Sequence, residues 1–286
     1  VATWPMRTEM ANRMVGHGTN ALASSVVMVC RTRSETAPAA TRGDFLRLLR
    51  EQLPSAIRDL EKGNIAPVDM AQASIGPGIG IFSEFSRVIE ADGSAMTVRT
   101  ALQLINDIVD EARGEEEADF DGETRFAATW FETHGFDPGG SGDAINLATA
   151  RNVSLDGIAR SGVIEAVAGK TRLLKRADLP DDWDPTTDIT LTVWECTQHL
   201  IKRLEEQGEA TAADLLHKMG PRAEAARTLA YRLYTHCERT GNAEEARAYN
   251  GLVIAWPELQ KLISSGSTQQ LNRVEEADLF TTGEER

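Results

Sequence analysis

Positive charge gathers in one short stretch of an otherwise acidic chain. Residues 151–176 contain six basic and two acidic residues, whereas the whole chain has a formal net charge of −14. Exposed lysine and arginine side chains are the groups with which proteins contact DNA phosphates. Solvated charges on the outer face of a hairpin would give the same composition, so both interpretations remain open. The candidate nucleic-acid contacts are the four basic residues at the end of this stretch: Lys170, Arg172, Lys175 and Arg176.

A glycine-rich segment, IGPGIG (Ile75–Gly80), is a second candidate site. Glycines let backbone N–H groups approach a phosphate closely. However, no Lys-Ser/Thr pair follows these glycines and no clear strand precedes them, as a nucleotide-binding loop would require. The segment is therefore predicted to be a turn between a helix and a strand. An independent enzyme that binds phosphate through these glycines remains one alternative for the function.

Thiol and imidazole side chains provide no strong metal site or catalytic group. Cys196 and His199 share one helix face, and His236 and Cys237 are adjacent in a later helix. Adjacent helical residues point about 100° apart, so the second pair cannot readily bind the same zinc ion. Neither a G-x-S-x-G nucleophile elbow nor an H-E-x-x-H motif occurs. No metal ligand and no catalytic residue is therefore predicted.

The elements that must position the basic residues follow a definite order. Helical patterns cover Ala144–Arg151 and Ser154–Arg160, and strands are predicted over GVIEAV (162–167) and KTRLLKR (170–176). Ala168-Gly169 would form the turn between the two strands. Helix, turn, helix and hairpin is the order of a winged helix, whose wing can lie along DNA. Such a unit can equally serve to bind only protein.

Most of the remaining chain is predicted to be helical. Thr41 or Asp44 can cap a long helix that ends at Gly63-Asn64, with Pro54 kinking or dividing it. Other helices are predicted over residues 68–74, 97–113, 124–134, 210–218, 223–239 and 243–263, and in a segment that ends at Leu204. Short strands are predicted over Val26–Arg33 and within residues 85–93, and the polar end is expected to be poorly ordered.

Composition and charge narrow the class of protein. The 286 residues, 41% of them hydrophobic, suffice for one large domain or two smaller ones. No signal segment and no apolar run of membrane-spanning length occurs, and three scattered cysteines argue against a disulfide framework. We therefore expect a soluble cytoplasmic protein without a membrane partner. Because the pI is near 4.9, any contact with nucleic acid must be local.

Several longer segments resemble one protein family. They are NALASSVVMVCR, the stretch from LRLLREQLPSAIRDL to SAMTVRTAL, WDPTTDITLTVWECTQHL, and LAYRLYTHCER with AEEARAYNGLV. Over most of residues 1–263, the chain is similar to the C-terminal region of the large adenine-specific DNA methylases associated with anti-phage gene clusters, which carry an N-terminal domain of unknown function. Residues 3–33 resemble the terminal strand hairpin of a class I methyltransferase domain. The resemblance implies that the intact protein transfers a methyl group from S-adenosylmethionine to adenine N6.

The motifs that carry this reaction are absent from the chain. No Pro-Pro pair occurs, so the family's Asp/Asn-Pro-Pro-Tyr/Phe tetrapeptide is missing, and no glycine-rich donor loop follows a first strand. No catalytic or cofactor-binding residue is therefore carried over, and no cofactor is expected in this part of the protein. The resemblance implies an accessory region of the methylase. Its expected partners are DNA, contacted through the basic hairpin, the methyltransferase domain upstream, and other defence-system proteins. A helical protein-interaction scaffold without DNA binding is the alternative.

The predicted architecture is mainly α with small β elements. Residues 1–33 would form the terminal hairpin of a truncated methyltransferase domain, and residues 34–136 a helical region. A winged-helix-like unit is embedded at residues 137–187, followed by helical hairpins over 188–263 and a polar tail over 264–286. The segment DPGGSGD, which opens the winged-helix-like unit, is expected to interrupt regular structure because proline and glycine disfavour it.

Overall fold

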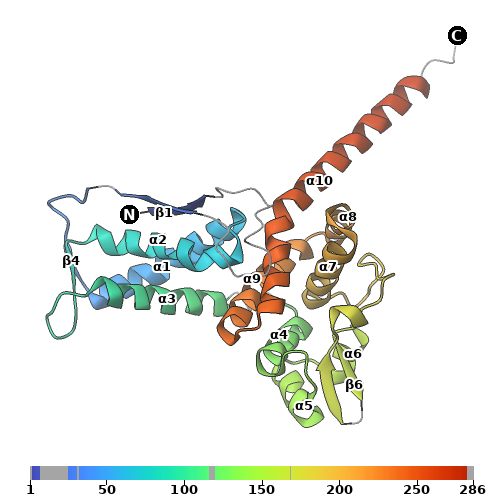
Figure 1. Cartoon of the computed structure of the whole chain (residues 1–286), viewed down its shortest axis with the longest axis horizontal. Helices are drawn as coiled ribbons and strands as arrows, with labels where there is room; N and C mark the ends of the chain where they lie inside the picture. Colours follow the sequence, from blue (N-terminus) through green and yellow to red (C-terminus); the bar gives the residue numbers. More distant parts are fainter. Residues whose placement is uncertain (1, 7–24, 31, 116–119, 168, 282–286) are drawn as a thin grey trace. The chain divides into compact units, whose positions relative to one another are not determined.

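The described part of the chain folds mainly into helices (Figure 1). The computed structural model describes residues 2–6, 25–30, 32–115, 120–167 and 169–281. Small sheets of two or three strands complete the regular structure in these ranges. The prediction of a mainly α chain with small β elements is therefore confirmed. No helix among these residues is long and apolar enough to cross a membrane.

The chain divides into two compact units. Unit 1 comprises Val1–Asp119 and Tyr234–Val253, and unit 2 comprises Phe120–Leu233 and Ile254–Arg286. Each unit is thus assembled from two separate stretches of sequence. The candidate nucleic-acid contacts all belong to unit 2.

Three long helices form the core of unit 1. They are α1 (Arg42–Lys62), α2 (Pro67–Glu84) and α3 (Val98–Glu115), which pack against one another (Figure 1). Thr97 lies just before α3, and its hydroxyl accepts a hydrogen bond from the Thr100 backbone N–H at 3.1 Å. Buried apolar side chains fill the space between the helices: Phe45, Leu49, Leu53, Ile57, Ile81, Ile105, Ile108 and Val109.

Short strands complete unit 1. Strand β1 (Ala2–Met6) pairs antiparallel with β2 (Ser25–Val29), with Trp4 opposite Val27, and this hairpin packs on α2. The strand predicted near Val26 is therefore confirmed, and its partner is β1. Strand β3 (Ala39–Thr41) pairs in parallel with β4 (Arg87–Ile89).

Helix α1 begins where the sequence predicts but is not divided. The Thr41 hydroxyl accepts the Asp44 backbone N–H, and the Asp44 carboxylate accepts the Thr41 backbone N–H, which makes a capping box. A kink or a division was expected at Pro54; the helix runs unbroken through this residue, so it is not divided. A proline inside a helix costs about 3 kcal/mol, and burial of the apolar face of α1 against α2 and α3 outweighs that cost.

The glycine-rich segment Ile75–Gly80 lies inside α2, so the predicted helix–strand turn is wrong. The predicted end of the helix at Ser74 is wrong for the same reason. A Cβ atom at Gly78 would lie 2.6 Å from Cγ2 of Ile105, so glycine here lets α3 approach α2 closely. Because the backbone N–H groups of a helix interior point along the helix axis to its own carbonyls, this segment cannot cradle a phosphate.

Unit 2 begins with three helices that pack against a three-stranded sheet. Helix α4 (Gly122–His134) is followed by β5 (Gly139–Gly140), α5 (Ser141–Ala150) and α6 (Leu155–Arg160). The hairpin of β6 (Ile164–Val167) and β7 (Lys170–Leu173) comes next (Figure 1). The antiparallel sheet has the order β5-β7-β6. The two predicted helices and the predicted hairpin are therefore confirmed.

The Pro/Gly segment separates α4 from α5, as predicted, but it also contains the short strand β5. Gly139 and Gly140 pair with Thr171 and Lys170 and so add the third strand to the hairpin. A Cβ atom at Gly139 would lie 2.5 Å from Cζ2 of Trp130. Glycine is needed here because the strand passes directly over the buried indole ring of α4.

The remaining helices follow with very short connections. After a 3₁₀ turn, η2 (Arg176–Asp178), come α7 (Val193–Gln207), α8 (Glu209–Met219), α9 (Arg222–Thr240) and α10 (Ala243–Thr281). Gly208, Gly220 and Gly241 have positive φ at the three joints, where glycine adopts the left-handed region without strain. Helix α10 continues to Thr281, beyond the predicted end of this helix at residue 263.

Candidate nucleic-acid interface

The basic hairpin places its cations on one side of the sheet. Thr171 and Leu173 are buried, whereas Lys170 is exposed and Arg172 is half-buried. Alternate residues of a strand point to the same face, so Lys170 and Arg172 share the outward face of β7. Gly169 has a φ of 78° in the turn between the strands. Two of the predicted contacts, Lys170 and Arg172, therefore lie on the outward face of the hairpin.

Arg172 is held between two carboxylates. Its Nη2 atom lies 2.6 Å from Oε2 of Glu165, which is the residue directly opposite on β6. Its Nη1 atom donates to Oδ2 of Asp178, in η2, at 2.7 Å. The hydrogen bond from Arg172 is the main cause that lowers the pKa of Asp178, so this carboxylate is ionised at neutral pH. Both terminal nitrogens of the guanidinium therefore contact carboxylates within the protein.

Arg176 connects the end of the hairpin to helix α7. Its Nη1 atom donates to Oε1 of Gln198 at 2.9 Å, and its Nε atom lies 4.0 Å from Glu205. The side chain is only 15% exposed. Lys175 and Lys170 are exposed, and neither forms an ion pair within the described part of the chain. Two of the four predicted contacts are thus available to a ligand, and two are engaged with residues of unit 2.

The helices beside the hairpin add little positive charge. On α6, Asp156, Ala159 and Arg160 are exposed, so a single cation is accompanied by a carboxylate. On α5, the exposed Ile145 is apolar, and its relative exposure is 53%. The exposed cationic surface of this region consists of Arg160, Lys170 and Lys175.

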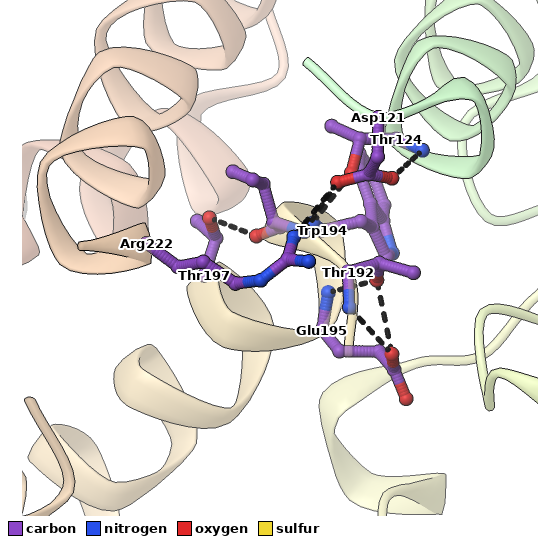
Figure 2. Close-up of polar contacts among 8 residues, drawn as sticks. Asp121, Thr124, Thr192, Trp194, Glu195, Thr197 and Arg222 are labelled. Carbon is purple, nitrogen blue, oxygen red and sulfur yellow. Dashed lines mark hydrogen bonds and ion pairs between the residues drawn. The ribbon is translucent and has the colours of Figure 1, made fainter. Parts of the chain in front are cut away.

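A polar junction between α4 and α7 was not foreseen from the sequence (Figure 2). Oδ1 of Asp121 accepts the Thr124 backbone N–H of α4 at 2.7 Å, and its Oδ2 accepts the Val193 backbone N–H of α7 at 2.9 Å. Arg222 approaches the same Oδ2 at 3.5 Å. The Thr124 hydroxyl accepts the Trp194 backbone N–H at 3.0 Å. Asp121 could have been found as a helix cap, because Asp precedes an apolar-periodic segment, but its bond to α7 has no local signal.

Glu195 belongs to the same junction. Its Oε2 accepts the backbone N–H and the hydroxyl of Thr192, and the Thr192 hydroxyl accepts the Glu195 backbone N–H in return (Figure 2). Burial raises the pKa of this carboxyl to about 8, and the negative charges of Asp188 and Asp121 add to the effect. Glu195 is therefore mostly protonated at neutral pH. The Thr-x-x-Glu spacing is the signature of a capping box and could have indicated this contact.

Cys196 and His199 are packing residues of α7. Burial raises the pKa of the Cys196 thiol to about 12, so the nucleophilic thiolate does not form at neutral pH. The His199 ring stacks on Trp183 with a centroid distance of 4.0 Å. Burial, aided by Lys202 and Arg203, lowers the pKa of His199 to about 4. Among the described residues, no group of three or more His, Cys, Asp or Glu side chains is arranged to hold a metal ion.

Comparison with known proteins identifies one family. The model of a domain of unknown function (DUF8807) matches residues 121–278. The match begins at Asp121, which accepts hydrogen bonds from both α4 and α7, and ends within α10. No curated protein and no solved structure matches the chain. The family model covers more than half of the sequence. The chain therefore belongs to the family defined by this domain of unknown function.

Proposed function

We propose that the chain is an accessory region of an S-adenosylmethionine-dependent, adenine-specific DNA methyltransferase of phage defence. In this role it supplies contacts to DNA or to partner proteins and does not catalyse methyl transfer by itself. The resemblance of residues 1–263 to such methylases supports the proposal, as does the antiparallel β1–β2 hairpin packed on α2. The absence of donor and catalytic motifs from the sequence is consistent with a region that acts alongside a catalytic domain.

The order of elements in residues 122–173 is the observation that carries the proposal. The succession α4-β5-α5-α6-β6-β7, with the sheet order β5-β7-β6, agrees with a winged helix in which β6 and β7 form the wing. Lys170 and Lys175 are exposed on this hairpin and in the residues that follow it. Two exposed cations next to a helix pair can bind the phosphates of duplex DNA, although the acidic remainder of the chain opposes binding.

Fluorescence anisotropy with a labelled DNA duplex tests this function. We compare the parent chain with Lys170→Ala/Lys175→Ala over a salt series from about 50 to about 200 mM NaCl. Each lost phosphate contact should reduce the slope of log affinity against log salt by about one, so the double variant should lose about two. Weakening should be similar for unrelated DNA sequences, because phosphate contacts carry no base information.

The matched control removes the same charge elsewhere. Lys62→Ala/Lys261→Ala takes away two exposed lysines outside the hairpin and should leave the salt slope close to that of the parent. Identical curves for the hairpin variant and the parent would exclude the hairpin as a DNA contact. If the shared affinity for DNA still falls as the salt concentration rises, the DNA contact lies elsewhere in the chain.

A helical scaffold that binds only protein is the second candidate, and the segment before α7 favours it. Residues 177–192 contain five aspartates and no basic residue, a composition that disfavours contact with nucleic acid, although Asp178, Asp181 and Asp184 each pair with a cation. Ile189 in this segment is 98% exposed. Asp188 fixes the loop, since it accepts the Thr190 backbone N–H at 2.8 Å and the Trp183 indole N–H at 2.9 Å. A rigid loop that presents an apolar side chain loses little entropy when a protein partner covers it.

The two candidates give different results with the same protein. The scaffold predicts no DNA binding even at about 50 mM NaCl. It also predicts that Ile189→Ser weakens binding to the methyltransferase domain supplied as a separate chain, measured by titration calorimetry. DNA binding that is lost in Lys170→Ala/Lys175→Ala and unchanged in Ile189→Ser would favour the accessory DNA contact.

A further inference from the structure

The geometry of the hairpin points to a restraint on its strongest phosphate-binding group. We propose that the carboxylates of Glu165 and Asp178 bind the Arg172 guanidinium, compete there with a DNA phosphate, and thereby limit the affinity of the hairpin for DNA. Full engagement of DNA then requires Arg172 to exchange these carboxylates for a phosphate group. The inference rests on the proposed DNA contact and deepens it.

The chemistry of arginine supports this exchange. A guanidinium presents its N–H donors in a planar fork that suits carboxylate and phosphate equally well. In Arg172, Nη1 and Nη2 each meet a different carboxylate, at 2.7 Å and 2.6 Å. The two partners come from separate elements, Glu165 from β6 and Asp178 from η2, so they approach the guanidinium from two directions.

The position of these pairs makes the exchange energetically accessible. The Arg172 side chain is 28% exposed, and those of Glu165 and Asp178 are 45% and 38% exposed. Ion pairs at such a surface contribute little to stability, because water screens them. A phosphate that displaces the carboxylates therefore needs to overcome only a small free energy, while the neighbouring cations add to its attraction.

Arg172 would complete a row of cations on the hairpin. Lys170 shares its face of β7, and Lys175 follows two residues after the strand. Three basic residues and two acidic residues make up this group, and both acidic residues pair with Arg172. Without those negative charges, the same surface presents three adjacent cations to the DNA backbone.

The test removes the carboxylate charges while keeping the shape of the side chains. Glu165→Gln/Asp178→Asn retains oxygen acceptors for Arg172 and for the Lys175 backbone N–H that Asp178 accepts at 3.3 Å. In the anisotropy assay with duplex DNA at about 50 mM NaCl, this variant should bind at least about threefold more tightly than the parent. Its salt slope should be steeper by up to about one, because Arg172 contacts a phosphate in a larger share of the complexes.

Two further proteins show whether the gain comes from Arg172. Glu206→Gln/Glu209→Gln neutralises two exposed carboxylates outside the hairpin and gives the same change in net charge. It should leave the salt slope near that of the parent. Adding Arg172→Ala to Glu165→Gln/Asp178→Asn should remove the gain in affinity, and circular dichroism should show unchanged helix content in all variants.

The possible failures separate the two proposals. If the parent binds DNA through its lysines but Glu165→Gln/Asp178→Asn binds no more tightly, the restraint is overturned and the DNA contact stands. An equal gain in the Glu206→Gln/Glu209→Gln control assigns the effect to net charge and also overturns the restraint. If none of the proteins binds the duplex, both the restraint and the DNA contact are overturned.

Discussion

Asp121 caps two helices with one carboxylate. Its two oxygens accept backbone N–H groups from α4 and from α7, and Arg222 lies 3.5 Å away. Substitution of an ordinary N-cap costs about 1 kcal/mol. Asp121→Ala removes the acceptor of the Thr124 and Val193 backbone N–H groups, one at the start of each helix, so we expect the free energy of unfolding to fall by about 2 to 3 kcal/mol. Urea denaturation followed by circular dichroism measures this loss.

Ser154→Ala is the matched control for Asp121→Ala. The Ser154 hydroxyl caps only α6, where it accepts the Gly157 backbone N–H at 3.0 Å. Its loss should cost about 1 kcal/mol. Equal losses for the two variants would show that the bond from Val193 to Asp121 contributes nothing to stability.

Glu195 makes the stability of unit 2 depend on pH. Its pKa is raised from 4.5 to about 8 in the folded chain, so the folded state binds a proton that the unfolded state has released. The resulting stability is fully present below pH 4.5 and is lost as the pH rises toward 8. Across this window, the free energy of unfolding should fall by roughly 1 kcal/mol per pH unit from this group.

Glu195→Gln should flatten that dependence. The amide keeps an oxygen to accept from Thr192 but cannot ionise. Urea denaturation at several pH values within the window measures the slope for the variant and for the parent. The exposed Glu209→Gln serves as the control and should keep the parental slope. A slope unchanged in Glu195→Gln would show that other groups cause the pH dependence.

The candidate interface was only partly predictable at the level of single residues. A tight turn at Gly169 was predicted, and it sets Glu165 opposite Arg172, so that ion pair follows from local sequence. The contact of Arg172 with Asp178 depends on the path of the chain after β7, and the bond from Arg176 to Gln198 spans 22 residues. Such contacts follow from tertiary packing, and charge counting along the sequence therefore overstated the free positive charge of the hairpin.

Gly78 lets α2 pack closely against α3 because it has no side chain. A Cβ atom at Gly78 would lie within 2.8 Å of three side-chain atoms of Ile105. Gly78→Ala raises helix propensity by about 1 kcal/mol, but the clash in a packed core costs about 1 to 3 kcal/mol. We therefore expect a net loss of stability, measured as a lower midpoint of thermal unfolding.

Two comparisons identify the clash as the cause. Gly251→Ala places a methyl group in open space inside α10 and should stabilise the chain by about 1 kcal/mol through helix propensity alone. In a double-mutant cycle, Gly78→Ala should cost less when combined with Ile105→Ala, which removes the atoms that clash. Strictly additive effects would contradict a close contact between these two positions.

Local signals predicted the elements that tertiary packing does not override. The capping box at Thr41, the periodic apolar residues of α1 and α3, and the glycine that ends α4 are all local features. Gly76 and Pro77 are helical because the apolar segment around them is buried against neighbouring helices. The pairing of Gly139 with Thr171, 32 residues further along, also has no local signal, so β5 was not predicted.

At the scale of the whole chain, the family match and the compact units have different boundaries. The family model begins at Asp121, whereas unit 1 also needs Tyr234–Val253 from α9 and α10. Within unit 1, the backbone N–H of Val68 donates to Oδ1 of Asn250 at 3.3 Å. Several side chains in that later segment are buried: Tyr234, Cys237, Ala246, Tyr249, Leu252 and Val253. A chain that starts at the family boundary therefore loses the partners of these residues.

The truncated chain 121–286 should fold as a helical protein but associate with itself. Its unit 2 residues keep their own core, while the apolar side chains of Tyr234–Val253 lose contacts with residues 1–119. Exposed apolar surface of this kind favours self-association. Light scattering should show larger species than for the full chain, and a dye that fluoresces on apolar surfaces should bind more strongly.

The control, residues 32–286, lacks only the β1–β2 hairpin and the segment between its strands, and keeps α1 to α3. Because Tyr234–Val253 stay covered in that control, it should bind less dye than 121–286, and the opposite order would overturn the assignment of this segment to unit 1.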